Sequence, residues 1–79
     1  MNFNYLVDAT NETCPMPLLR AKQQLNKMKA GECVKVLASD AASVRDFSSF
    51  ISLAGHELHS DTGLSSDGKE TFIYFIIKR

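Results

Sequence analysis

The sequence of 79 residues has no net charge, no long hydrophobic run and no signal-peptide pattern. A membrane-spanning helix needs about 20 consecutive apolar residues, whereas the longest apolar run is only residues 72–77. Lys plus Arg and Asp plus Glu number 9 each, and a dedicated nucleic-acid-binding protein usually carries a basic surplus. The N-terminus lacks the basic start and apolar stretch of a signal peptide. We therefore expect a cytoplasmic globular protein that binds neither membranes nor, directly, nucleic acid.

Cysteine is also scarce, with only Cys14 and Cys33 present. A small secreted domain normally carries more cysteines, paired as a disulfide framework. A zinc site would need a second cysteine pair or nearby histidines, but His56 and His59 lie far along the chain and bring no third ligand. We therefore expect free thiols in a reducing compartment and no metal site.

The short length limits what the chain can enclose. We expect a single domain over residues 1–79, which buries only about 60% of the surface that its unfolded form exposes. Such a core leaves no room for an enclosed active site with a large cofactor. We therefore expect no cofactor, and chemistry carried by a few residues near the surface.

Hydrophobic patterning predicts the element order strand, helix, strand, helix, strand, strand. The predicted strands are residues 5–7, 33–38, 57–61 and 71–77, of which the third is weak and the last is the strongest. Residues 65–68 are typical of a hairpin turn between the last two strands.

Helices are predicted after the first and second strands. The first helix begins at Pro15 and stops at Gly31. The second begins after the capping residues Ser39 and Asp40 and ends at Gly55. Each carries an apolar stripe at helical spacing: Leu18, Ala21, Leu25 and Met28 in the first, and Val44, Phe47, Ile51 and Ala54 in the second.

This element order predicts a two-layer α/β sandwich. Each strand–helix–strand unit favours a right-handed crossover between parallel strands, which puts both helices on one face of one sheet. The strand at residues 71–77 is apolar on both faces, so we expect it in the centre of the sheet. We also expect the uncovered face of the sheet to be partly apolar and available to a partner.

Both prolines, Pro15 and Pro17, lie directly after Cys14. Cys14 therefore falls where a loop meets the first helix, and the unpaired N–H groups and dipole of a helix N-terminus lower a thiol pKa. Proline is well tolerated in a first helical turn. With Cys14 as the N-cap, the prolines stiffen the turn, and the N–H groups of Met16 and Leu18 lie nearest the sulfur.

Other residues near this junction are candidates for partner docking or thiolate stabilisation. Arg20 and Lys22 add positive potential one to two turns along the helix, and Met16 is expected to point outward toward a partner. Asp8 and Asp40 each follow a predicted parallel strand, so both should lie at the same sheet edge. Turn formation by Asp8 and helix capping by Asp40 also explain these two residues.

A lone, exposed thiolate can support few reactions. A protease or amidase needs a general base such as His beside the thiol, but His56 and His59 follow the opposite end of the second helix. A two-cysteine redox centre needs Cys33, which begins a strand and is expected to pack in the sheet at the far edge. What remains is covalent carriage of a group from one protein to another.

The segment Cys14-Pro15-Met16-Pro17 resembles the CPxP signature of the TusA-like (SirA/YedF/YeeD) sulfur-carrier family, and the similarity extends over essentially the whole chain. The flanking features that match, in order, are Asp8, Gly31-Glu32, residues 39–47 and residues 54–58. Asn11 departs from the family pattern, which usually has Gly three residues before the cysteine. Asn is the best substitute where φ must be positive. A second, smaller departure is Asp40-Ala41 in place of the common Asp-Pro.

The resemblance implies a βαβαββ fold, an α+β two-layer sandwich with two helices on one face of a four-stranded mixed sheet. It implies that Cys14 carries sulfur as a persulfide, with Pro15 and Pro17 as scaffold. The implied donor is a cysteine desulfurase or a rhodanese-type protein, and the acceptor is a downstream protein, for example in tRNA thiolation. The alternative is a non-catalytic interaction or regulatory module on the same fold, in which Cys14 is idle.

Overall fold

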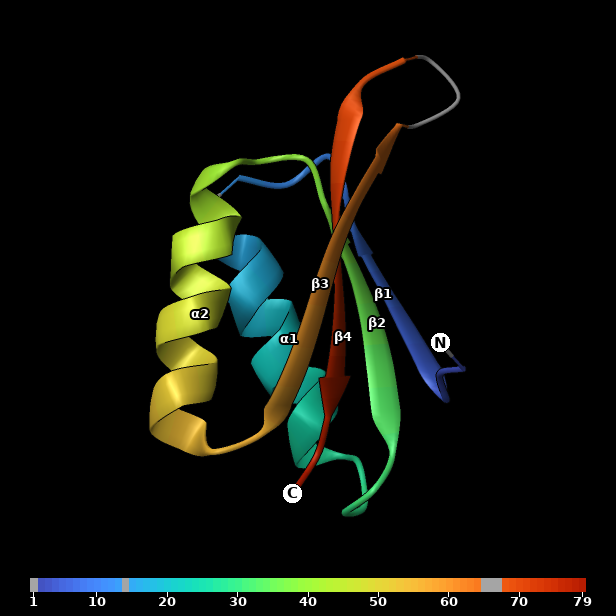
Figure 1. Cartoon of the computed structure of the whole chain (residues 1–79), viewed down its shortest axis with the longest axis vertical. Coiled ribbons are helices and arrows are strands. Elements are labelled where there is room, and N and C mark those ends of the chain that lie inside the picture. Colours follow the sequence, from blue (N-terminus) through green and yellow to red (C-terminus); the bar gives the residue numbers. More distant parts are fainter. Residues whose placement is uncertain (1, 14, 65–67) are drawn as a thin grey trace.

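The computed structural model describes residues 2–13, 15–64 and 68–79. Along the chain the elements are β1 (Tyr5–Ala9), α1 (Met16–Asn26), β2 (Cys33–Ala38), α2 (Ala42–Ala54), β3 (Glu57–Leu64) and β4 (Glu70–Ile77). The strands form one sheet in the order β1-β2-β4-β3, and both helices cover the same face of it (Figure 1). The predicted βαβαββ sandwich is therefore confirmed.

The strand directions explain why both helices share a face. β1 pairs with β2 in parallel, while β4 is antiparallel to both β2 and β3. β3 therefore runs in the same direction as β2, and each helix connects two strands of the same direction. Two crossover connections with the same handedness place both helices on the same face of the sheet. β4 lies between β2 and β3, which confirms its predicted central position.

The core lies between the helices and the covered face of the sheet. Its residues are Val7, Ala21, Leu25, Met28, Val34, Val36, Ala38, Phe47, Ile51, Tyr74 and Ile76. The rings of Phe47 and Tyr74 stack with their centroids 4.3 Å apart. Burial raises the pKa of the Tyr74 hydroxyl, and the hydroxyl groups of Tyr74 and buried Ser43 are 2.7 Å apart and hydrogen-bonded. This bond supplies the partner that a buried hydroxyl needs.

The first helix is shorter than predicted. It ends at Asn26, where the N–H of Lys27 donates to the carbonyl of Gln24 and the N–H of Met28 donates to the carbonyl of Leu25. Gly31, predicted as the stop signal, instead has a φ of 91° in the connection to β2. Its N–H donates to the carbonyl of Lys78 at 2.7 Å. Glycine is thus needed at this position for the turn into the sheet.

The buried face of α2 is rotated from the predicted stripe. Phe47 and Ile51 are buried as predicted, but Val44 and Ala54 are exposed, and Ser43 is buried instead. The hydrogen bond of Ser43 to the buried Tyr74 hydroxyl explains this rotation. Gly55 ends the helix in a left-handed conformation, as predicted. No helix within the described residues is long and apolar enough to cross a membrane.

The third strand is longer than predicted, since β3 continues to Leu64 in register with β4. The hairpin turn predicted for residues 65–68 falls largely on residues 65–67, which lie outside the described residues. On the uncovered face, Phe75 lies 6.3 Å from the ring of Phe3, centroid to centroid. The Nζ of Lys35 lies over both rings, at 5.7 and 5.2 Å. The open face is thus partly apolar, as predicted, and is partly covered by the chain's own side chains.

We predict that Phe47→Ala lowers the free energy of unfolding by about 3–5 kcal/mol, because it removes a fully buried ring and leaves a cavity. Leu53→Ala is the matched control on the same helix, since Leu53 is 91% exposed. Urea denaturation followed by circular dichroism measures both variants. Equal stability of the two variants would contradict the core described above.

Candidate functional site

The candidate site lies at the sheet edge where β1 and β2 end and the two helices begin. Ala9 and Ala38, the last residues of these parallel strands, are paired in register. In Figure 1 the connections that follow β1 and β2 run side by side to α1 and α2 at this edge. Cys14 itself lies outside the described residues, so the site is described from its neighbours. We call residues 10–13 the site loop.

Helix α1 begins one residue later than predicted. Its N-cap is Pro15 rather than Cys14, and Met16 is its first residue. The carbonyl of Pro15 accepts the N–H of Leu19 at 3.0 Å. The N–H of Met16 donates to the carbonyl of Thr13 at 2.9 Å, so this amide is already engaged within the protein. The expectation that it is a free donor for the sulfur was wrong.

The two residues after Pro15 have opposite environments. Pro17 is buried and lies within the first turn of α1, where its missing N–H leaves no hydrogen bond unmade. Met16 is 43% exposed, as predicted. The start of the helix is therefore anchored by one side chain and presents the other to solvent.

Arg20 is engaged with the site loop and with β1. Its Nη1 donates to the carbonyl oxygen of Asp8 at 2.7 Å and to Oε1 of Glu12 at 2.9 Å. The positive charge predicted to act on the thiolate is therefore paired with a carboxylate. Sequence reasoning missed Glu12, because an acid eight residues before an arginine, across a loop–helix boundary, has no periodic signature.

Additional hydrogen bonds hold the site loop from the strand side. Asp8 Oδ1 accepts the N–H and the hydroxyl of Thr10, at 3.1 and 2.7 Å. These two bonds hold the pKa of the Asp8 carboxyl below its ordinary value, and the bond from the Thr10 hydroxyl has the larger effect. The hydroxyl of Ser39, which follows β2, donates to the carbonyl of Thr10. Asp8 thus forms a turn, and the loop is fixed to both strands.

Lys22 and Asp40 both contact residues of α2. The Nζ of Lys22 lies 5.1 Å from the centroid of the Phe50 ring in α2, an arrangement that favours a cation–π interaction. Asp40 Oδ1 accepts the N–H of Ala42 at 2.9 Å. Asp40 therefore serves the start of α2, although the N-cap position belongs to the next residue, Ala41.

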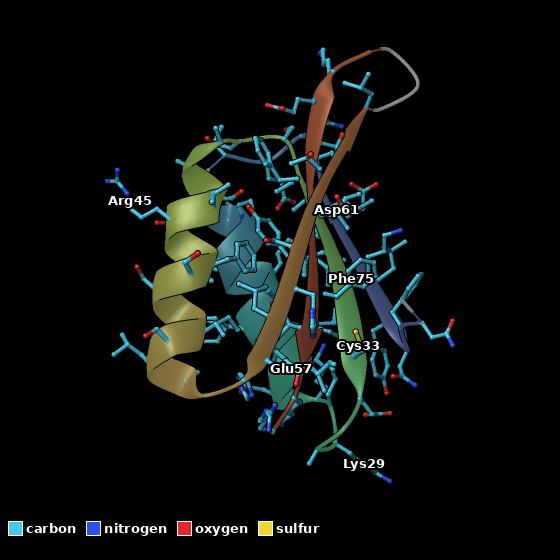
Figure 2. The ribbon with its side chains drawn as sticks, viewed as in Figure 1. Lys29, Cys33, Arg45, Glu57, Asp61 and Phe75 are labelled. Carbon is cyan, nitrogen blue, oxygen red and sulfur yellow. The ribbon has the colours of Figure 1, made fainter. Side chains whose placement is uncertain are left out.

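Cys33 and the histidines lie at the opposite end of the molecule. Cys33 is buried at the start of β2, and desolvation raises its thiol pKa. Figure 2 shows Cys33 and Glu57 toward the end of the sheet away from the site loop. His59 Nε2 lies 2.5 Å from Glu57 Oε2, and His56 Nδ1 accepts the N–H of Arg79 at 3.1 Å. None of these groups is at the edge where residues 13 and 15 lie.

Comparison with known proteins identifies the family. The family model described as "Sulfurtransferase TusA" matches residues 5–78. The chain belongs to this family. The sulfur carrier protein TusA of Allochromatium vinosum is 37% identical over 78 residues, covering 99% of this chain and 96% of that protein. The sulfur carrier protein TusA of Pseudomonas putida strain KT2440 is 35% identical over 77 residues, covering 94% and 88%.

A solved structure supports the fold of this TusA family member. The crystal structure of the SirA-like protein from Desulfitobacterium hafniense superposes with a TM-score of 0.73, covering 96% of this chain and 100% of that one. Its sequence identity is 23%, so the likeness concerns the arrangement of helices and strands.

We predict that Asp8→Asn destabilises the protein above about pH 4 and that this destabilisation shrinks progressively as the pH falls below that value. A carboxyl whose folded pKa is lowered stabilises the fold above its unfolded pKa, and that contribution is lost as the pH falls through the folded pKa. Thermal melting of both proteins across this range measures the difference. A difference in melting temperature that does not change with pH would contradict a charge-dependent role.

Proposed function

We propose that this protein is a sulfur carrier that accepts a sulfane sulfur as a persulfide on Cys14 and relays it to an acceptor protein. The observation that carries the proposal is the contrast between the two cysteines of this TusA family member. Cys33 is buried with a raised pKa, whereas Cys14 directly precedes the N-cap of α1. The relatives named sulfur carrier proteins support this assignment.

The proposed sulfur transfer is an exchange between thiolates and persulfides, so it needs no external oxidant. The Cys14 thiolate attacks the outer sulfur of a persulfide on the donor. A new S–S bond forms at Cys14, the donor's S–S bond breaks, and the donor cysteine leaves as a thiolate. The acceptor's nucleophile then attacks the outer sulfur, and Cys14 is released as a thiolate. The positive end of the helix dipole of α1 favours the anionic forms at both stages.

The prolines and the exposed residues around Cys14 have supporting parts in this proposal. Pro15 and Pro17 stiffen the chain on the helical side of Cys14. Met16, which is exposed, contacts the rim of a partner's active site. Lys22, on α1, and Asp40, which precedes α2, help to dock the partner.

The partners follow from the chemistry of the transferred sulfur. The donor is a cysteine desulfurase or a rhodanese-type protein, because both form persulfides. The acceptor is a downstream protein, for example one that thiolates tRNA, and the exchange takes place in the reducing cytoplasm, where a free thiol persists.

We predict that Cys14→Ser abolishes sulfur loading, while Cys33→Ala leaves it intact. Each protein is incubated with a cysteine desulfurase and cysteine, and separately with a rhodanese and thiosulfate. Intact-mass spectrometry with peptide mapping then detects one additional sulfur atom and locates it. The mass gain is expected on Cys14 and is expected to be reversed by a reductant.

A second candidate function is that of a protein-interaction module. The observation that supports it is the set of half-buried apolar residues on the open sheet face. That function predicts no sulfur gain from either donor, with both donors shown to load a known carrier in parallel. Loading that survives in Cys14→Ser would also contradict the carrier proposal.

A further inference from the structure

The Glu12–Arg20 pair is the nearest described ion pair to Cys14 along the chain, and the proposed transfer does not yet explain it. Glu12 precedes Cys14 by only two residues in the sequence. Arg20 reaches back from α1 to bond Glu12 at 2.9 Å and the Asp8 carbonyl at 2.7 Å. One guanidinium nitrogen thus joins the helix after Cys14 to the loop and strand before it.

The second oxygen of Glu12 makes its carboxylate depend on Arg20. Oε2 is buried and has no hydrogen-bond partner within the described parts of the chain. A buried carboxylate oxygen without a hydrogen-bond partner is costly. The Glu12 and Arg20 side chains are 34% and 38% exposed, so solvent screens part of the charge, and within the described residues Arg20 is the cation that pairs with this carboxylate. Loss of Arg20 would therefore leave the Glu12 carboxylate without its paired cation, two residues before Cys14 in the chain.

We infer that Glu12 and Arg20 are positioning residues for Cys14: they bridge the site loop to α1 and balance each other's charge next to the thiol. This inference rests on the carrier function proposed above, in which Cys14 must react as an anion. A thiolate and a persulfide anion are each destabilised by a nearby carboxylate and stabilised by a nearby cation. The pair keeps the carboxylate that fastens the loop from raising the thiol pKa.

The other charged groups near this edge are held in place by their own contacts. Asp8 of β1 is bonded to Thr10, and Asp40 is bonded to the N–H of Ala42. On α1, the Nζ of Lys22 lies 5.1 Å from the centroid of the Phe50 ring.

From α2, Arg45 points away from the body of the molecule (Figure 2). Asp46 lies close enough to Tyr74 to contribute, with Asp40, to the raised pKa of that hydroxyl. The charges on these groups do not change when Glu12 or Arg20 is substituted, so each substitution reports on the pair.

We predict that the two single substitutions shift the reactivity of Cys14 in opposite directions. Glu12→Gln leaves the guanidinium unbalanced and lowers the midpoint of the pH–alkylation profile by about half a unit, whereas Arg20→Gln raises it by a similar amount. The double variant returns close to the unsubstituted protein. The measurement is the rate of iodoacetamide modification at residue 14, resolved by peptide mass spectrometry, across the pH range of thiol ionisation.

Lys27→Gln is the matched control, because it removes a positive charge from an exposed position at the far end of α1. Circular dichroism confirms that each variant is folded. If the pair only tightened the loop, either substitution would loosen the same bridge, so shifts in the same direction would overturn the inference. Absent shifts would overturn it as well. Alkylation needs no sulfur donor, so a failure of the protein to load sulfur contradicts the carrier function alone.

Discussion

Parallel strands can be joined only by a crossover connection, and α1 is that connection between β1 and β2. The parallel pairing brings the carboxyl ends of both strands to one edge, and it brings the first turn of α1 to the same edge. The hydrogen bonds that join the site loop to the end of β2 and to α1 depend on this arrangement. Ser39 reaches the loop from the end of β2, and Arg20 reaches it from α1.

The stacked rings of Phe47 and Tyr74 fix the second helix against the central strand. Their hydrogen-bonded neighbour Ser43 determines which face of α2 is buried. The core is thus concentrated under the helices, and the proposed chemistry lies in a loop at the sheet edge. A loop that is short and bonded at both ends can present a reactive residue without an enclosing pocket, as a small protein that passes a group between larger partners requires.

Much of this fold could be predicted from the sequence, because the patterns involved are local and repeated. The stripe of α1 and the double-sided apolarity of β4 each follow from periodicity. The exact start of α1 was predicted one residue too early, because proline favours the first helical position. In the structure Pro15 is the N-cap, and the N–H of Met16 bonds to the carbonyl of Thr13.

The role of Arg20 could not be predicted either. In the sequence it belongs to a basic face of a helix, whereas in the structure its charge is paired with Glu12 across a loop. The burial of Ser43 could not be predicted for a similar reason, because its hydrogen-bond partner Tyr74 lies 31 residues away in the sequence. These two errors fall where a polar side chain finds a partner distant in sequence.

The central claim is that Cys14 holds a sulfur atom that can leave again, and the fate of a labelled sulfur tests it most directly. Radiolabelled cysteine and a cysteine desulfurase are incubated with an excess of this protein, which is then purified and treated with cyanide. If the protein is a sulfur carrier, the label purifies with it and leaves as thiocyanate, which is the product expected of a sulfane sulfur. Label that stays on the desulfurase, or that resists cyanide on this protein, would contradict the account.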